Sequence, residues 1–247
     1  MERLDDILGY KNRSIYQDDD CFSFSLDSIM LANFATIRMR DKNILDLGCG
    51  NGVIPLILSL RTDKKIVGVE LQKKLANLAI KSVEYNDLES QIEILNINMK
   101  DYVNTETMEK YDLITCNPPY FKVNEENYFN LSLEKVIARH EVEVTLDDVF
   151  CISKKLLKNN GNFAIVHRPV RLMEIFDLFR KNNIEPKRLQ FVYEKISKES
   201  TLVLVEGQKC GKAGLKIERP FILYNEDGTM TKEYESLCRE VINNATK

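Results

Sequence analysis

The chain has 247 residues, of which 44% are hydrophobic, so it can bury a large core. Its formal net charge of −3 argues against a bulk electrostatic attraction to nucleic acids or membranes. The charged start of the chain and the lack of any apolar run near ~18 residues argue against a signal region and a membrane span, and predict a soluble, cytoplasmic protein.

Strands and helices alternate over the middle of the chain. In chain order, the hydrophobic patterns predict a strand at 43–48, a helix at 53–60, a strand at 65–70, a helix at 72–86, strands at 92–98 and 111–117, a helix at 145–161, a strand at 162–167 and a helix at 171–183. Thr145 is the expected N-cap of the helix at 145–161, and Gly161 is expected just past its end. Such alternation is typical of a parallel sheet with helices on both faces.

Two more strands are predicted at 188–194 and 201–209, and the connection between them is too short for a crossover helix. They are therefore expected to pair antiparallel. The predicted fold is α/β and Rossmann-like. Its sheet is expected to have about seven strands, which are mostly parallel and include one antiparallel strand near an edge. A turn at 224–230 and a closing helix at 231–244 complete a single domain over 1–247, whose N-terminal extension, 1–42, is expected to cap the substrate side.

The six cysteines form no C-x-x-C pair and have no closely spaced histidine partner. This pattern is not typical of a zinc site or of a disulfide framework. The cysteines are therefore predicted to be reduced thiols in the core, and no metal site is expected.

A glycine-rich stretch, DLGCGNG at 46–52, follows the first strand. Glycines at a strand-to-helix turn let the backbone approach a ligand, but the spacing departs from the G-x-G-x-x-G of dinucleotide-binding folds. Glu70 ends the second strand, where a carboxylate can accept hydrogen bonds from ribose hydroxyls. Asn98 ends the third strand, where an amide can contact an adenine edge, and Asp46 can orient the glycine loop. These features favour S-adenosylmethionine over NAD.

DLGCGNG, the strand-end Glu70 and NPPY at 117–120 together resemble the class I S-adenosylmethionine-dependent methyltransferases, in the branch that methylates exocyclic amines and amides. Further stretches resemble the bacterial tRNA (adenine-N6)-methyltransferases that act at position 37 of a valine tRNA; they are FSFSLDSIML at 22–31, ARHE at 138–141, FAIVHRPVRL at 163–172 and GLKIERPFILYNEDG at 214–228. The resemblance covers nearly the whole chain. It implies a Rossmann-like fold, S-adenosylmethionine as cofactor and tRNA as partner.

NPPY implies the chemistry of transfer. The side-chain carbonyl of Asn117 and the backbone carbonyl of Pro118 would accept the hydrogens of an amine and aim its nitrogen at the methyl group. Pro118 and Pro119 restrict the backbone that carries these acceptors, and Tyr120 offers a ring on which a base can stack. No metal and no strong general base is required. By itself NPPY is also an ordinary strand terminator.

The resemblance implies a cofactor site formed by Asp46, Gly48, Cys49, Gly50, Gly52, Glu70, Leu71, Asn98, Met99 and Asp27. Two of these positions carry reservations. Asp27 has an equally good structural role as an acid at the start of a helix. The related enzymes commonly have aspartate where Asn98 stands, so we expect altered contact with the cofactor and not its loss.

Charge is distributed unevenly. Residues 153–219 contain 15 Lys and Arg against 7 Asp and Glu, a net charge of +8 that leaves −11 for the rest of the chain. This excess indicates either solvated helix faces or a basic face for RNA. The segment 121–144 is too long for a plain connection, so it is expected to be a lid or an RNA-contacting insert. The predicted substrate-binding residues are Tyr120, Phe121, Arg139, His140, Arg168, Lys209 and Lys212.

Three alternatives stay open. Protein glutamine N5-methyltransferases that act on release factors carry the same NPPY, and ribosomal RNA methyltransferases carry a close variant. A non-catalytic RNA- or nucleotide-binding module is the third. Outside the motifs, His167 is expected to be a packing residue, Phe22 and Phe24 are expected in the core, and the chain is expected to be a monomer.

Overall fold

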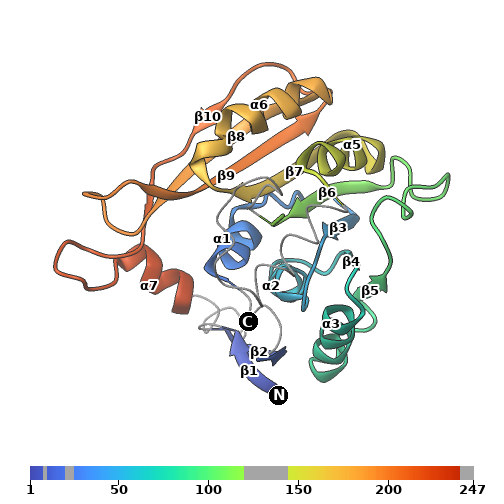
Figure 1. The fold of residues 1–247 in the computed structure, drawn as a ribbon, viewed down its shortest axis with the longest axis horizontal. Coiled ribbons are helices and arrows are strands. Elements are labelled where there is room, and N and C mark those ends of the chain that lie inside the picture. The colour runs from blue at the N-terminus through green and yellow to red at the C-terminus, as the bar shows by residue number, and fades with distance from the viewer. Residues whose placement is uncertain (8–9, 20–24, 120–143, 240–247) are drawn as a thin grey trace, which may run out of the picture.

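A mixed nine-stranded sheet forms the centre of the computed structural model, which describes residues 1–7, 10–19, 25–119 and 144–239 (Figure 1). Its strand order is β10-β8-β9-β7-β6-β3-β4-β5, with β11 paired to β8. The long strands are β3 (Asn43–Leu47), β4 (Lys65–Glu70), β5 (Ile92–Asn96), β6 (Tyr111–Cys116), β7 (Leu157–His167), β8 (Ile184–Tyr193) and β9 (Ser200–Lys209). The short ones are β10 (Lys216–Ile217) and β11 (Phe221–Ile222).

Helices cover both faces of this sheet. They are α1 (Leu26–Phe34), α2 (Val53–Arg61), α3 (Lys73–Tyr85), α5 (Leu146–Leu156), α6 (Leu172–Lys181) and α7 (Lys232–Arg239), with a 3-10 turn, η1 (Pro169–Arg171), before α6. Adjacent strand residues point to opposite faces, so Ile44 packs with α1 and α2, whereas Leu45 packs with α5 and α6. Among the described helices, none is long and apolar enough to cross a membrane.

The predicted doubly wound sheet is confirmed. β3, β4, β5, β6 and β7 are mutually parallel, and β9 is antiparallel to both β7 and β8. The turn at 224–230 closes around a bridge between Tyr224 and Met230. The closing helix begins at Lys232, and its predicted end at 244 lies outside the described residues.

The helix predicted at 145–161 is too long. Thr145 does cap it, because its hydroxyl accepts from the amide of Asp148 and the Asp148 carboxylate accepts in return from the Thr145 amide. The helix ends at Leu156, however, and β7 begins at Leu157, which pairs with Tyr111. Gly161 therefore lies inside β7 and is not a C-cap; a Cβ there would come within 2.9 Å of the Lys158 carbonyl oxygen.

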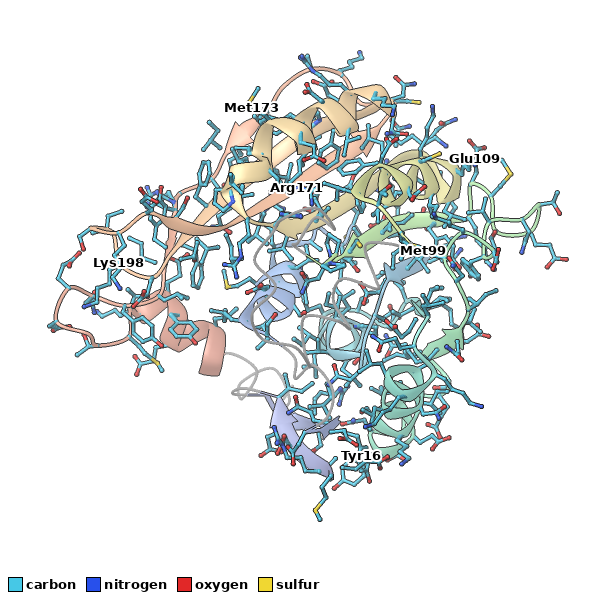
Figure 2. The ribbon with its side chains drawn as sticks, in the orientation of Figure 1. Tyr16, Met99, Glu109, Arg171, Met173 and Lys198 are labelled. Atoms are coloured by element: carbon cyan, nitrogen blue, oxygen red, sulfur yellow. The ribbon has the colours of Figure 1, made fainter. Side chains whose placement is uncertain are left out.

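Two strands at the N-terminus were not predicted. β1 (Glu2–Ile7) and β2 (Tyr10–Asp18) form a separate antiparallel sheet that packs on α3. The backbone amide of Tyr16 donates to Ser82 Oγ at 2.9 Å, and the Tyr16 ring meets Tyr85 edge-on (Figure 2). The hairpin therefore supports α3, and it also reaches the loop after β3, where the Tyr16 carbonyl oxygen accepts from the Asn51 amide at 3.4 Å.

Arg188 of β8 ties α1 to the sheet. Its guanidinium lies 4.4 Å from the centre of the Phe34 ring and donates to the Phe34 carbonyl oxygen at 3.0 Å. It also lies 3.6 Å from the buried Glu206 carboxylate, which accepts from the Thr36 amide at 2.7 Å. Because the partners of Arg188 include the last residue of α1, these contacts fix the end of that helix against the sheet.

Replacement of Arg188 by Met is expected to lower the free energy of unfolding by about 2 kcal/mol, because it leaves a buried carboxylate without its cation. Chemical denaturation followed by circular dichroism measures this. Lys198→Met removes an exposed pair with Glu194 and is the control, expected to change stability by less than about 0.5 kcal/mol. Equal effects of the two substitutions would contradict the anchoring role of Arg188.

Candidate active site

A cavity of about 420 Å³ lies where the carboxyl ends of β3, β4 and β6 meet. Parallel strands bring their carboxyl ends to the same edge of a sheet, which is where doubly wound folds bind ligands. The cavity walls come from the loop after β3, the end of β4, the turn after β5, the end of β6 and the first residues of α1. Five segments that are distant in the sequence therefore converge on one site.

The glycine loop after β3 is fixed by Glu70. Gly50 and Gly52 have φ of 56° and 90°, in the left-handed region that favours glycine. The Gly50 amide donates to Glu70 Oε2 at 2.9 Å, and the Gln72 amide donates to Glu70 Oε1 at 2.8 Å. The Glu70 carboxylate therefore joins the glycine loop to the segment that follows β4.

Most of the predicted cofactor residues lie together on the cavity wall. Those that line it are Asp27, Gly48, Cys49, Gly50, Glu70, Leu71, Asn98 and Met99. Gly52 instead lies next to Ala79 of α3, and Asp46 is fully buried in β3, so these two residues do not line the cavity. Among the described residues no group of three or more His, Cys, Asp and Glu side chains is placed to hold a metal ion.

The third strand is shorter than predicted, because β5 ends at Asn96. The Asn96 amide donates to the carbonyl oxygens of Glu70 and Leu71, both at 2.9 Å, and so joins β5 to the end of β4. Asn98 lies in the turn that follows, where its Oδ1 accepts from the Lys100 amide at 2.9 Å. Asn98 and the adjacent Met99 still line the cavity (Figure 2 labels Met99).

Asp46 is fully buried in β3. Its Oδ1 accepts from the Thr115 hydroxyl at 2.6 Å, and its Oδ2 has no hydrogen-bond partner among the described atoms. Burial, together with the nearby Glu70 carboxylate, raises the pKa of Asp46 to about 8. The carboxyl is therefore mostly protonated at neutral pH, and its hydrogen bond with Thr115 joins β3 to β6.

Cys49 and Cys116 also line the cavity as free thiols. Burial raises the pKa of each thiol well above its ordinary value, so neither is a nucleophile at neutral pH. The core placement predicted for the cysteines is correct for these two. It is wrong for Cys151 and Cys210, which are exposed.

Asn117 and both prolines of NPPY follow the carboxyl end of β6 and line the cavity. The Asn117 amide nitrogen donates to Ser28 Oγ at 2.9 Å, and Oδ1 is the acceptor atom of this side chain. Sequence reasoning missed Ser28; its signal was the FSFSLDSIML stretch, in which only Asp27 was considered. Several of the predicted residues lie outside the described part of the chain. They are Tyr120, Phe121, Arg139 and His140, the rest of the insert at 121–144 except Val144, and Phe22 and Phe24.

His167 ends β7 beside the cavity, and Arg168 follows it. His167 is buried, and this burial lowers its pKa to about 4, so the ring is neutral and packs as predicted. Its Nδ1 accepts from the Arg168 amide at 2.8 Å. The exposed Arg168 side chain lines the cavity.

Lys209 and Lys212 do not line this cavity, and their predicted contact with an RNA substrate stays a prediction. Lys209 ends β9 at the opposite edge of the sheet, where its Nζ donates to Glu109 at 2.9 Å and to the Leu157 carbonyl oxygen at 2.8 Å. Leu157 begins β7, whereas the cavity lies beyond the end of that strand at His167. Lys212 follows Lys209 by three residues, and its carbonyl oxygen accepts from Lys187 at the same edge.

Comparisons with known proteins agree with this geometry. The family model described as "Methyltransferase small domain" matches residues 25–185. A protein from Flavobacterium psychrophilum named tRNA1(Val) (adenine(37)-N6)-methyltransferase is 26% identical over 94% of this chain and 97% of its own length. A Parabacteroides distasonis protein of the same name is 26% identical over 72% of this chain and 73% of its own.

Solved structures show the same fold. A predicted O-methyltransferase from Agrobacterium tumefaciens superposes with a TM-score of 0.65 at 17% identity, covering 86% of this chain and 95% of its own. A geranyl diphosphate C-methyltransferase from Streptomyces coelicolor, crystallised with S-adenosyl-L-homocysteine, superposes with a TM-score of 0.54 at 11% identity, over 74% and 76% of the two chains.

The buried Asp46 generates a prediction for stability. The pKa of Asp46 is about 8 in the folded protein and near 3.8 in an exposed carboxyl. At pH values between these two, the folded state therefore binds the proton more tightly than the unfolded state does. The free energy of unfolding is therefore expected to fall as pH rises from about 4 to 8, with a contribution of up to about 1.4 kcal/mol per pH unit. Asp46→Asn is expected to remove this slope in denaturation curves recorded without added ligand.

The exposed Asp63 provides the control, and Asp63→Asn is expected to leave the pH profile unchanged in shape between pH 5 and 8. A profile for Asp46→Asn that runs parallel to the wild-type profile over this range would mean that Asp46 is ionised in the folded protein.

Proposed function

The chain belongs to the methyltransferase small domain family, and from this premise we propose that it transfers a methyl group from S-adenosylmethionine to the exocyclic N6 amine of an adenine in tRNA. The names of the relatives support adenine 37 of a valine tRNA as the target. The observation that carries the proposal is the meeting of Glu70 and the glycine loop with Asn117 and Pro118 in one cavity.

The residues present fit the cofactor. The Glu70 carboxylate, only 6% exposed and placed on the cavity wall, suits ribose hydroxyls. Val69, Leu71, Ile97 and Met99 give the same end of the cavity apolar sides that suit an adenine ring. Asp27 lies across the cavity at the start of α1 and suits the amino group of the methionine part. When bound, S-adenosylmethionine supplies an electrophilic methyl group.

The chain's own contribution is to position the amine. The lone pair of an adenine N6 is delocalised into the ring, so the nitrogen must be held and aimed before it can attack. Asn117 Oδ1 and the Pro118 carbonyl accept its two hydrogens and stabilise the positive charge that develops on nitrogen. As the new N–C bond forms and the S–C bond breaks, the nitrogen becomes cationic, and it then loses one proton to water. No base in the cavity is needed for this step.

The activity is tested with S-adenosylmethionine labelled in its methyl group and two substrates in parallel, unmodified tRNA and a peptide release factor. We expect label in tRNA that digests to N6-methyladenosine. Asn117→Ala is expected to lower kcat by at least about 100-fold, because it removes one acceptor for the developing charge, while the Kd of the cofactor stays within about threefold. Label in the release factor would instead assign glutamine N5 methylation. Equal losses of transfer and cofactor binding would contradict the role of Asn117.

Ser28 is a positioning residue for this reaction, because its hydroxyl holds the Asn117 amide from another element of the fold. Ser28→Ala is expected to lower kcat about tenfold with little change in KM for tRNA, since one buried hydrogen bond is lost. Ser28→Thr keeps a hydroxyl and is expected to restore most of kcat. A loss of thermal stability without this difference between Ala and Thr would assign Ser28 a packing role only.

A further inference from the structure

The turn after β5 brings one polar side chain, that of Asn98, to the cavity wall. Its neighbours in the chain, Ile97 and Met99, also line the cavity and belong to the apolar end that suits the adenine ring of the cofactor. The polar group that this turn offers to the edge of that ring is therefore the carboxamide of Asn98.

The turn itself fixes the orientation of this carboxamide. Asn98 Oδ1 accepts from the backbone amide of Lys100 at 2.9 Å. A backbone amide can only donate, so the oxygen of the carboxamide, and not its nitrogen, has to face Lys100. The backbone carbonyl oxygen of Asn98 accepts in turn from the amides of Asp101 and Tyr102, at 3.0 and 3.1 Å. The chain therefore orients Asn98 before any ligand enters.

The other end of the carboxamide is a hydrogen-bond donor. Within the described part of the chain, Asn98 Nδ2 donates to no acceptor. An adenine ring offers two kinds of partner at its edge, because its ring nitrogens N1 and N7 accept, whereas its exocyclic amine donates. A donor that loses water when a ring enters the cavity is costly unless it meets an acceptor. Asn98 Nδ2 therefore suits a ring nitrogen and not the amine.

We propose that Asn98 Nδ2 donates to a ring nitrogen of the cofactor's adenine, so that Asn98 does not recognise the exocyclic amine. An aspartate in the same turn would accept from Lys100 with one oxygen and from the amine with the other. Asparagine replaces that second acceptor by a donor and so reverses the polarity of the contact. The inference rests on the cofactor placement given under the proposed function, and it does not depend on which amine receives the methyl group.

The test is equilibrium binding by isothermal titration calorimetry, with S-adenosyl-L-homocysteine and its analogue that has hydrogen in place of the exocyclic amine. Wild type is expected to bind these two compounds with Kd values within about threefold of each other, because the Asn98 contact does not involve the amine. Asn98→Asp is expected to prefer S-adenosyl-L-homocysteine by about 10-fold or more, because a charged acceptor then meets the amine.

Asn104→Asp is the matched control. Asn104 Oδ1 accepts from the amides of Glu106 and Thr107, at 2.9 and 3.1 Å, so this exposed asparagine has the same role in a neighbouring turn that does not line the cavity. Asn104→Asp is expected to bind both compounds as wild type does. A preference of wild type for the amine that Asn98→Ala abolishes would mean that Asn98 accepts from the amine, and would overturn the proposal.

A second arm identifies the acceptor with the 1-deaza and 7-deaza analogues of S-adenosyl-L-homocysteine, in each of which C–H replaces one ring nitrogen. Wild type is expected to bind one of the two at least about fivefold more weakly than the parent compound, because the Asn98 donor loses its partner. Asn98→Ala has no such donor and is expected to bind that analogue and the parent compound equally. Equal ratios in wild type and Asn98→Ala would overturn the contact.

The outcomes separate this inference from the proposed function. If wild type binds S-adenosyl-L-homocysteine and Asn98→Ala leaves every ratio of Kd values unchanged, the Asn98 contact is overturned and the cofactor assignment stands. If wild type does not bind S-adenosyl-L-homocysteine, the cofactor assignment fails, and the contact fails with it. Thermal denaturation of each variant excludes misfolding as the cause of a loss.

Discussion

The site depends on the two hydrogen bonds that the Glu70 carboxylate accepts from backbone amides. One comes from Gly50, in the loop after β3, and the other from Gln72, just after β4. A left-handed glycine loop is flexible by itself, and a charged acceptor at 2.9 Å fixes its position. The same carboxylate faces the cavity, so the group that shapes the loop is also the group best placed to bind a ligand there.

A second coupling joins the substrate side of the cavity to the N-terminal part of the chain. Asn117 ends β6, and its amide is held by Ser28 of α1, a residue 89 positions earlier. The position of α1 is set in turn by Arg188 on β8, through the Phe34 carbonyl and ring. The orientation of one amide at the end of a strand thus depends on the packing of a helix and on a strand near the far edge of the sheet.

The sequence was sufficient for features that are encoded locally. Apolar runs identified β3 to β9, the glycine spacing located the loop, and Thr145 with Asp148 formed the expected helix start. The hairpin of β1 and β2 and the short strands β10 and β11 were not identified. The other misses concern contacts between distant residues. No local pattern shows that Lys209 is buried against Glu109, or that Leu157 leaves a helical pattern to pair with Tyr111. Ser28 was missed for the same reason, because a serine becomes informative only when its partner is known.

The excess of Lys and Arg over 153–219 has to be interpreted together with the carboxylates that these side chains contact. Several of its cations are paired with carboxylates; the pairs are Lys158–Asp112, Arg171–Glu174, Lys181–Asp147, Arg188–Glu218, Lys198–Glu194, Lys209–Glu109 and Lys216–Glu218. Four of these pairs use acids already counted in the net charge of +8. Only Lys158–Asp112, Lys181–Asp147 and Lys209–Glu109 bring in acids from outside this range, and they lower the net charge to +5. The exposed Arg168 side chain lines the catalytic cavity, so part of the remaining positive charge stands next to the site itself.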